Sequence, residues 1–407
     1  MQKIKNSPAL LKSYLPFIKE ELYEEILELS KKLQGARILF LNATKYGGGV
    51  AEILQAEIPL LNSLGINVAW ENLEANEDFY KVTKAIHNSL QGEKSFTFTV
   101  KTRGIYESVN EKNAKLLSKQ KFDLLFIHDP QPMAIPFFWP NAPKSIWRCH
   151  IQISPTNPQV WDYLKGFLKS YESATFSLEE FIPKGLKIPN RIVQPAINPL
   201  SPKNKKIDLE KAEEIIKKLG LNTKKLIISQ ISRFDPWKDP LGVIQSYRLA
   251  KKEFPDLQLI LAGSAASDDP ENFKIMAFVK KEANKDKNIK IFSNLDDIQI
   301  NAIQTFSKII LQKSLREGFG LTVAEALYKE TPVIGGDTGG IRTQIFNGKD
   351  GYLVKSVEEC GQRIIDLLNN NTLRLKMGKA GKTIIADKFL LPRLVRDELS
   401  LFVDTIK

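Results

Sequence analysis

Cysteine, histidine and long apolar runs are scarce in this chain of 407 residues. Its two cysteines, Cys149 and Cys360, lie in separate predicted domains and show no metal-ligand spacing, so we expect two small buried side chains. No run reaches the roughly 18 apolar residues of a membrane span. The first 22 residues lack the apolar core of a signal peptide. The sequence therefore predicts a cytoplasmic protein.

Acidic residues are outnumbered, since 47 aspartates and glutamates face 59 lysines and arginines, which gives a formal charge of +12. Such a charge raises the alternative of a protein that binds nucleic acid or an anionic membrane surface. The lysines are scattered over many predicted helix faces with acids between them, and no basic strip studded with aromatic residues accompanies them. We interpret the charge as solvated surface, and expect neither nucleic acid nor membrane as a partner.

The chain does contain a regular alternation of short apolar runs and helical patterns, which is typical of parallel α/β sheets. Strands are expected at 36–41, 67–71, 123–127, 145–148, 174–177, 192–194, 225–231, 257–262, 289–292, 308–312, 332–336 and 351–354. A proline-bounded segment, 195–199, and the polar run 201–206 interrupt the series and are interpreted as a hinge. We expect two Rossmann-like doubly wound domains, 1–198 and 199–388, facing each other across a cleft. A helix at 389–407 is predicted to pack back on the first domain.

Residues 313–320 form a glycine-rich loop between a predicted strand and a predicted helix. In an open α/β sheet such a loop lies where unpaired helix N–H groups favour an anion. Gly318 and Gly320 would let the backbone approach a ligand closely. Glu317 and Glu325 are eight positions apart, about 2.2 helical turns, so they would contact different parts of one elongated ligand. The alternative is a capped surface helix with exposed acids.

Two more loops follow predicted strand ends. Gly47, Gly48 and Gly49 open a helix after the first strand and would allow a diphosphate near the backbone, although a mobile glycine loop is the alternative. Arg233 and Lys238 follow the first strand of the second domain, where fixed cations can stabilise a departing diphosphate. Ordinary surface cations are the alternative, but the same loop holds two aromatic residues that are poorly suited to exposure.

Two of the three histidines, His128 and His150, fall just past predicted strand ends, at the edge of the sheet where ligands bind. Each is either a functional residue or a structural histidine with satisfied hydrogen bonds. Their shared position favours function, more strongly for His150. The adjacent acids Asp268 and Asp269 are interpreted as a helix cap rather than as metal ligands.

Several sequence blocks resemble a known enzyme family. The run at 316–327, with Pro-Val-Ile-Gly at 332–335 and Gly-Gly-Ile at 339–341, is similar to the donor-site signature of retaining two-domain nucleotide-sugar glycosyltransferases. More restricted blocks narrow the resemblance to the trehalose glycosyltransferring synthases, which make trehalose from a nucleotide-glucose and glucose. These restricted blocks are His-Asp-Pro-Gln-Pro at 128–132, Trp-Arg-Cys-His at 147–150 and Arg-Phe-Asp-Pro-Trp-Lys at 233–238, and Gly-Gly-Gly-Val-Ala-Glu-Ile at 47–53 belongs to the same resemblance.

The resemblance runs from about residue 36 to the C-terminus and implies a GT-B fold, transfer with retention of configuration, and no metal or cofactor. It also implies roles for individual residues. Arg233 and Lys238 would hold the diphosphate, Glu317 the donor sugar and Glu325 the ribose. His150 would touch the sugar near the reacting carbon.

The same resemblance places Gly318, Phe319, Gly320 and Leu321 in the donor-binding loop, and the backbone of Gly47, Gly48 and Gly49 over the phosphates. His128 and Gln152 fall on the acceptor side. The implied partners are a nucleotide-sugar donor and a sugar acceptor, and family members are often homodimers.

The chain departs from the family pattern at two positions. Gln152 stands where the family usually has an acid, and Asn198 stands where aspartate is common. The base of the donor, ADP- or UDP-glucose, stays open at this point. A trehalose phosphorylase, which releases the sugar to inorganic phosphate, is the nearest alternative, and a related transferase with another sugar or small polyol as acceptor is another.

Overall fold

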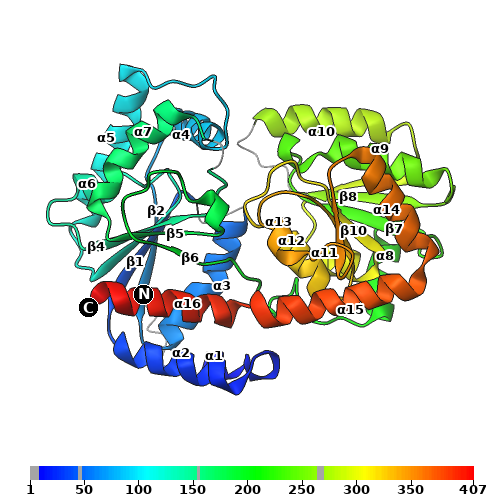
Figure 1. Ribbon diagram of the computed structural model, residues 1–407, viewed down its shortest axis with the longest axis horizontal. Coiled ribbons are helices and arrows are strands. Elements are labelled where there is room, and N and C mark those ends of the chain that lie inside the picture. Colours follow the sequence, from blue (N-terminus) through cyan, green and yellow to red (C-terminus); the bar gives the residue numbers. More distant parts are fainter. Residues whose placement is uncertain (1–8, 45–47, 154–155, 264–269) are drawn as a thin grey trace. The chain divides into compact units, whose positions relative to one another are not determined.

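The computed structural model describes residues 9–44, 48–153, 156–263 and 270–407 (Figure 1). Its chain forms two compact units. The first comprises Met1–Pro195 together with Leu391–Lys407, and the second comprises Ala196–Leu390. Each unit is built on its own parallel sheet, so the predicted fold class, two doubly wound α/β units, is confirmed.

The first unit holds a six-stranded parallel sheet with the order β2-β1-β3-β4-β5-β6. Its strands are β1 (Arg37–Asn42), β2 (Asn67–Asn72), β3 (Leu124–His128), β4 (Lys144–Cys149), β5 (Ser173–Phe176) and β6 (Asn190–Ile192). The central strand β3 is buried throughout, as expected for a parallel sheet covered on both faces. Because the chain passes from β1 to β2 on one side and returns to β3 on the other, the order reverses between β1 and β3.

Helices surround this first sheet. They are α1 (Ala9–Lys12), α2 (Glu20–Lys32), α3 (Gly49–Ser63), α4 (Glu77–Leu90), α5 (Val100–Leu117), α6 (Ile135–Phe138), α7 (Pro158–Leu164) and α16 (Leu391–Ile406). Local caps define their starts: the Asn76 side chain accepts from the Phe79 N–H before α4, and Thr99 and Thr102 form a capping box at α5. Short 3₁₀ turns occur at Leu15–Phe17, Lys165–Ser170 and Glu179–Phe181.

The C-terminal helix α16, red in Figure 1, lies along α2 and also contacts α3. Its Phe402 ring packs edge-on against two strand residues of the sheet, with centroid distances of 5.1 Å to Phe126 and 6.0 Å to Phe40. All three rings are fully buried. The last segment of the chain is therefore part of the core of the first unit, although α16 begins at Leu391 and the last strand of the sheet ends at Ile192.

The second unit repeats the plan with the strand order β12-β11-β10-β7-β8-β9. Its strands are β7 (Ile227–Ile231), β8 (Gln258–Gly263), β9 (Ile289–Ser293), β10 (Ile309–Gln312), β11 (Val333–Gly336) and β12 (Gly351–Val354). Its helices are α8 (Leu209–Lys218), α9 (Pro240–Lys251), α10 (Pro270–Ala283), α11 (Asp297–Phe306), α12 (Leu321–Tyr328), α13 (Ile341–Gln344), α14 (Val357–Asn369) and α15 (Asn371–Lys388), with a 3₁₀ turn at Pro236–Lys238. Here the order reverses between β7 and β10.

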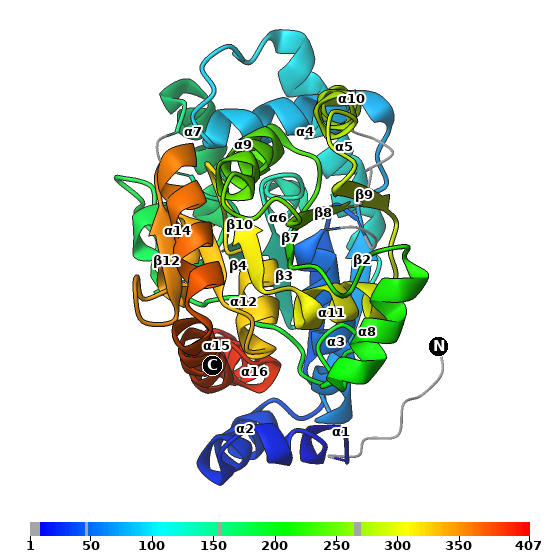
Figure 2. The ribbon, with the colours of Figure 1, turned by 90° about the vertical axis from the view of Figure 1, so that its right-hand side faces the viewer.

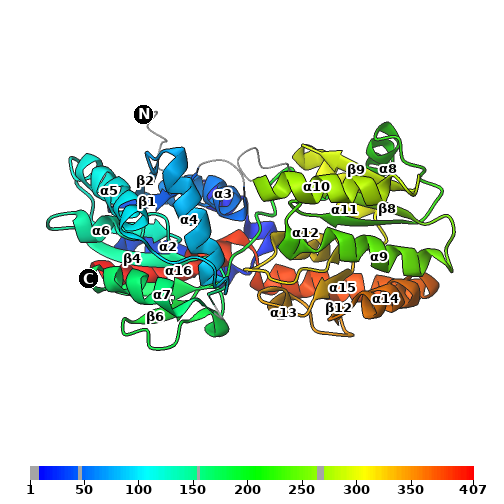
Figure 3. The ribbon, with the colours of Figure 1, turned by 90° about the horizontal axis from the view of Figure 1, so that it is seen from above.

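Each face of this second sheet has its own hydrophobic core. Alternate residues of β8 point to opposite faces, so that Leu259 and Leu261 join one core while Ile260 joins the other. The first core is completed by α9, α10 and α14, and the second by α8 and α11, which lie on opposite sides of the sheet (Figures 2 and 3). Burial on both faces explains why these strands appear in the sequence as continuous apolar runs.

Several strand boundaries differ from prediction by one or two residues, and the edge strand β6 differs at both ends. The edge strand expected at 192–194 lies instead at Asn190–Ile192. Past this point, the carbonyls of Gln194 and Pro195 accept hydrogen bonds from the Arg393 guanidinium at 2.8 and 2.9 Å, so they do not extend the sheet.

Both cysteines are buried free thiols, as predicted. Among the described residues, no helix has the length and apolarity that a membrane crossing requires.

Candidate active site

The loop between β10 and α12 presents Glu317, which is 9% exposed. One carboxylate oxygen, Oε2, accepts hydrogen bonds from three donors: Lys238 Nζ at 2.6 Å, Ser314 Oγ at 3.1 Å and Gln312 Nε2 at 3.3 Å. Gln312 is the last residue of β10, so the loop is folded back over its own strand. The structure thus brings together Glu317 and Lys238, two predicted site residues that are 79 positions apart.

Gly320 at the end of this loop and Gly340 before α13 are each required to be glycine, for different structural reasons. Gly320 has φ +87° at the start of α12, a conformation that side chains rarely adopt, and a Cβ there would lie 3.2 Å from Glu317 Cγ. At Gly340 a Cβ would lie 2.4 Å from the Phe319 Cα, so only glycine lets the turn before α13 contact the loop between β10 and α12. Phe319 is buried against Phe389, with ring centroids 5.4 Å apart, which makes it a core residue of the unit. Gly318, Gly320 and Leu321 are half-buried.

The loop after β7 carries the two predicted cations. Asp235 Oδ1 accepts from the Trp237 N–H at 2.8 Å and so begins the 3₁₀ turn that ends at Lys238. The Lys238 carbonyl accepts from Gln230 Nε2 at 2.7 Å, and its side chain is 17% exposed. Arg233 is more exposed and pairs with Asp235 of its own loop at 3.3 Å. The two cations therefore lie in one loop but have different partners.

Glu325 lies on α12 and is almost fully buried. Its Oε2 accepts from Gln304 Nε2 at 2.9 Å, and its Oε1 pairs with Lys203 Nζ at 3.3 Å. Burial by itself would raise the pKa of this carboxyl, but Lys203, Lys329 and the bond from Gln304 bring the pKa below its ordinary value. Glu325 is therefore a buried carboxylate with cationic neighbours. Sequence reasoning missed Lys203, which lies in the segment interpreted only as a hinge.

In the first unit, the ends of β3 and β4 bring His128 and His150 together. Their rings are stacked, with centroids 5.2 Å apart and planes 8° apart, and His128 Nδ1 lies 2.9 Å from His150 Nε2. Asp129, between the two strands, has φ +65° and accepts the His150 N–H on Oδ1 at 2.8 Å. The sequence indicated each histidine separately but not the pair, because the pairing depends on the parallel register of His128 with Arg148.

The environment keeps both imidazoles neutral. Burial and the nearby Arg148 guanidinium hold the pKa of His128 and of His150 well below the ordinary value, and the neighbouring His128 ring lowers the pKa of His150 further. Burial raises the pKa of Asp129 to about 7, against the opposing effects of the His150 N–H bond and Arg148. Because both rings are neutral, one of the two facing nitrogens, His128 Nδ1 or His150 Nε2, donates a hydrogen bond and the other accepts it.

The remaining predicted residues are placed as follows. Gly48 has φ +83° and precedes α3, and Gly49 is the first residue of that helix. A Cβ at Gly48 would meet nothing within 4 Å, so its backbone angle rather than crowding favours glycine. Gln152 is half-buried in the turn after β4. Gly47 and the acids Asp268 and Asp269 lie outside the described residues.

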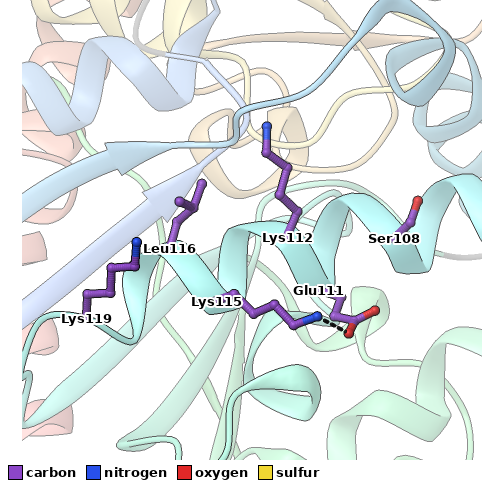
Figure 4. Close-up of a pocket in the computed structure, with 6 residues that line it drawn as sticks. All are labelled: Ser108, Glu111, Lys112, Lys115, Leu116 and Lys119. Atoms are coloured by element: carbon purple, nitrogen blue, oxygen red, sulfur yellow. Dashed lines mark hydrogen bonds and ion pairs between the residues drawn. The ribbon is translucent and has the colours of Figure 1, made fainter.

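A separate hollow of about 320 Å³ lies on the outer face of α5 (Figure 4). It is lined by Ser108, Glu111, Lys112, Lys115, Leu116 and Lys119. Two of its lysines are engaged locally, since Lys115 pairs with Glu111 at 2.6 Å and Lys112 with Glu74 at 3.2 Å. None of the predicted site residues lines this hollow. Several of the described site residues lie instead on the loops after β1 and β3 and after β7 and β10, where the strand order of each sheet reverses and open α/β sheets bind ligands.

Comparison with known protein families agrees with both units. The family described as "Trehalose synthase, N-terminal domain" matches residues 40–183, and "Glycosyl transferases group 1" matches residues 211–384. A trehalose synthase of Rubrobacter xylanophilus is 41% identical over 411 residues, covering 99% of this chain and 98% of its own. A trehalose synthase of Pyrococcus horikoshii is 38% identical and covers 94% and 93%.

Solved structures support the fold. A UDP-forming α,α-trehalose-phosphate synthase from Burkholderia xenovorans has a TM-score of 0.74 at 14% identity, and covers 92% of this chain and 99% of its own. A sucrose-phosphate synthase from Thermosynechococcus elongatus has a TM-score of 0.67 at 15% identity, covering 90% and 98%. These neighbours establish the GT-B architecture. Together with the full-length relatives, they show that the chain is a glycosyltransferase and belongs to the trehalose synthase family.

Proposed function

We propose that this enzyme makes trehalose from a nucleotide-activated glucose, ADP- or UDP-glucose, and free glucose, reversibly and with retention at the anomeric carbon. The observation that carries the proposal is the Lys238–Glu317 pair, 2.6 Å apart, at the point where the strand order of the second sheet reverses. The full-length relatives named trehalose synthase support the same assignment.

In the proposed reaction, the bond between the anomeric carbon and the diphosphate breaks while an acceptor hydroxyl adds to the same face of the sugar. The departing oxygen gains negative charge and takes the acceptor proton. Lys238 stabilises that charge, with Arg233 as a second cation of the same loop. Three donors converge on Glu317, so this carboxylate is fixed in place beside Lys238, where it can meet the transferred sugar. The half-buried glycines Gly318 and Gly320 leave room for the ligand beside the loop.

For the nucleotide, we propose that Glu325 contacts the ribose. Its carboxylate is ionised, and a carboxylate accepts strong hydrogen bonds from hydroxyl groups. For the acceptor side, we propose that His150, His128 and Gln152 contact the sugars. A neutral imidazole can hydrogen-bond to a sugar hydroxyl without opposing the positive charge that develops on the sugar ring, and burial together with Arg148 keeps both rings neutral.

The test is a panel of nucleotide sugars against free sugar acceptors, with the anomeric configuration of each product determined by NMR. We expect an α,α-linked disaccharide from a nucleotide-glucose and glucose, and none from the Lys238→Ala variant within the same time. Formation of an inverted product, or of no disaccharide with any donor, would contradict the proposal.

A trehalose phosphorylase is the second candidate, because a trehalose phosphorylase of Pleurotus pulmonarius is 28% identical over 93% of this chain. The match covers only 58% of that relative's own length. Incubating trehalose with either inorganic phosphate or a nucleoside diphosphate separates the two reactions. Glucose 1-phosphate formed with phosphate alone would support the phosphorylase, whereas a nucleotide sugar formed with the diphosphate supports the synthase.

A further inference from the structure

A second ion pair joins the same two loops as Lys238 and Glu317 but takes no part in the proposed chemistry. Lys313 follows β10 directly, and its ammonium pairs with Asp239 Oδ2. The Lys313 side chain is 7% exposed and that of Asp239 20%. We propose that Lys313 and Asp239 are positioning residues: their ion pair holds the loop after β7 against the loop after β10, and so fixes Lys238 in line with Glu317. The inference rests on the proposed function of that site.

Two side-chain contacts hold Asp239 in an uncommon backbone conformation. Its φ of +47° is in the left-handed region, its Oδ1 accepts the Gly242 N–H at 3.0 Å as the cap of α9, and its Oδ2 faces Lys313. A Cβ at Gly242 would lie 2.1 Å from Oδ2, so glycine leaves this carboxylate its place. Because Asp239 directly follows Lys238, fixing Asp239 also fixes the main chain from which the Lys238 side chain extends.

The loop after β7 and the loop after β10 contact each other at several neighbouring residues. The Leu315 N–H donates to the Trp237 carbonyl at 2.8 Å, and the Arg316 guanidinium lies 4.6 Å from the centre of the Trp237 ring. Lys238 then reaches Glu317. The Lys313–Asp239 pair is the contact nearest the end of β10. Since β10 and β7 are neighbours in the sheet, the pair spans the two adjacent strand ends that the site depends on.

Each charge of this pair needs the other, because both groups are largely shielded from water and have little solvent to stabilise an unpaired charge. Removing one member of a buried ion pair leaves the other without compensation and favours movement of the loop towards water. A misplacement of about 1 Å can cost roughly 10²-fold in rate. Lys313 therefore affects transfer through the position of Lys238, without contacting the substrate.

Two charge-removing variants test the inference. Lys313→Met keeps the length of the side chain, and Asp239→Asn keeps an N-cap that tolerates a left-handed backbone. We expect each to lower kcat by roughly 10 to 10²-fold, while the Kd for the free nucleoside diphosphate changes much less. The double variant should be no slower than the slower single variant, because both lose the same contact. Lys313→Arg should retain most of the activity.

A second readout does not depend on catalysis. The rate at which acetic anhydride acylates Lys238, followed by mass spectrometry, should rise several-fold in Lys313→Met and in Asp239→Asn. The matched control is Lys225→Met, which removes a lysine paired with Asp256 at 2.6 Å, before the opposite end of β7. This control should leave kcat and the Lys238 acylation rate unchanged.

Several results would overturn the inference: kcat within about threefold of wild type in either single variant, losses that multiply in the double variant, or an unchanged acylation rate. If Lys313→Met fails to fold, Asp239→Asn alone decides, since its cap is preserved. A wild-type enzyme that forms no disaccharide would contradict the proposed function instead, and the acylation rate would still decide the role of the pair.

Discussion

At the scale of single residues, the two acids of the β10–α12 region have different surroundings, and this separates their expected effects. Glu317→Gln removes the charge that faces Lys238, so it should lower kcat more than it weakens binding of the free diphosphate. Glu325→Gln should mainly weaken nucleotide binding, by about 1–3 kcal/mol, because ribose contacts persist in ground and transition states alike. Titrations with the diphosphate, alongside kcat, measure both. Equal proportions of lost affinity and lost rate in the two variants would refute the division of roles.

Lys238 itself gives a second prediction at this scale. Its side chain is partly exposed, so Lys238→Ala should leave the fold intact while kcat falls by ~10² or more, because the cation stabilises charge that appears only as the diphosphate departs. Melting temperature and kcat are the measurements. Lys217→Ala, which removes a lysine from an exposed helical pair with Glu213, is the control. Near-normal kcat in Lys238→Ala would show that Lys238 is only a surface charge.

At the scale of elements, the start of the connection from β3 to β4 makes the free energy of unfolding depend on pH. Burial raises the pKa of Asp129 from an ordinary 3.8 to about 7. Between pH 3.8 and about pH 7, the Asp129 carboxyl is therefore protonated in the folded state and ionised in the unfolded state. This contribution to stability is present below about pH 4 and is lost as pH rises through 7. Asp129→Asn keeps an oxygen for the His150 N–H but cannot titrate.

The free energy of unfolding should therefore change differently in the two proteins. The value for Asp129→Asn minus that for wild type should decrease by about 1.4 kcal/mol per pH unit as pH falls from 7 to 4. The free energy of unfolding of the first unit can be measured by tryptophan fluorescence during urea unfolding. Four of the five tryptophans lie in that unit: Trp70, Trp139, Trp147 and Trp161. The exposed Asp162→Asn serves as control. A difference that does not vary with pH would mean that Asp129 ionises normally.

At the scale of the whole molecule, the first unit depends on a helix from the far end of the chain. Phe402 of α16 is fully buried against Phe40 and Phe126, so Phe402→Ala should destabilise that unit by about 3–5 kcal/mol. The second unit, which α16 does not belong to, should keep its own stability. Hydrogen exchange resolved by segment measures the two units separately. The control is Phe346→Ala, at a half-exposed ring of the second unit.

An unchanged exchange rate in β1 and β3 of the Phe402→Ala variant would contradict this account. Loss of protection in both units together would also contradict it, because it would make the whole chain one cooperative folding unit rather than two.

Much of the architecture could be predicted from the sequence by itself. Apolar runs separated by helical patterns specified two doubly wound sheets, because strands buried on both faces need continuous apolar residues. Strand ends followed by Gly320, Lys238, His128 and His150 indicated which loops to consider. These signals are local: each depends on residues within a few positions of one another, as do turns, caps and helix periodicity.

Only the tertiary structure decided which of these residues meet. Lys238 reaches Glu317, and Lys313 reaches Asp239, because β10 pairs with β7 rather than with β9, which precedes it in the chain. Lys203 reaches Glu325 across more than 120 positions because its segment is held against α11, where Asn301 donates to the carbonyls of Pro202 and Lys205. No local pattern encodes strand order, since it is settled by the packing of all the helices against both faces of the sheet. The sequence by itself determined the elements and the loops, and the order of the strands determined their partners.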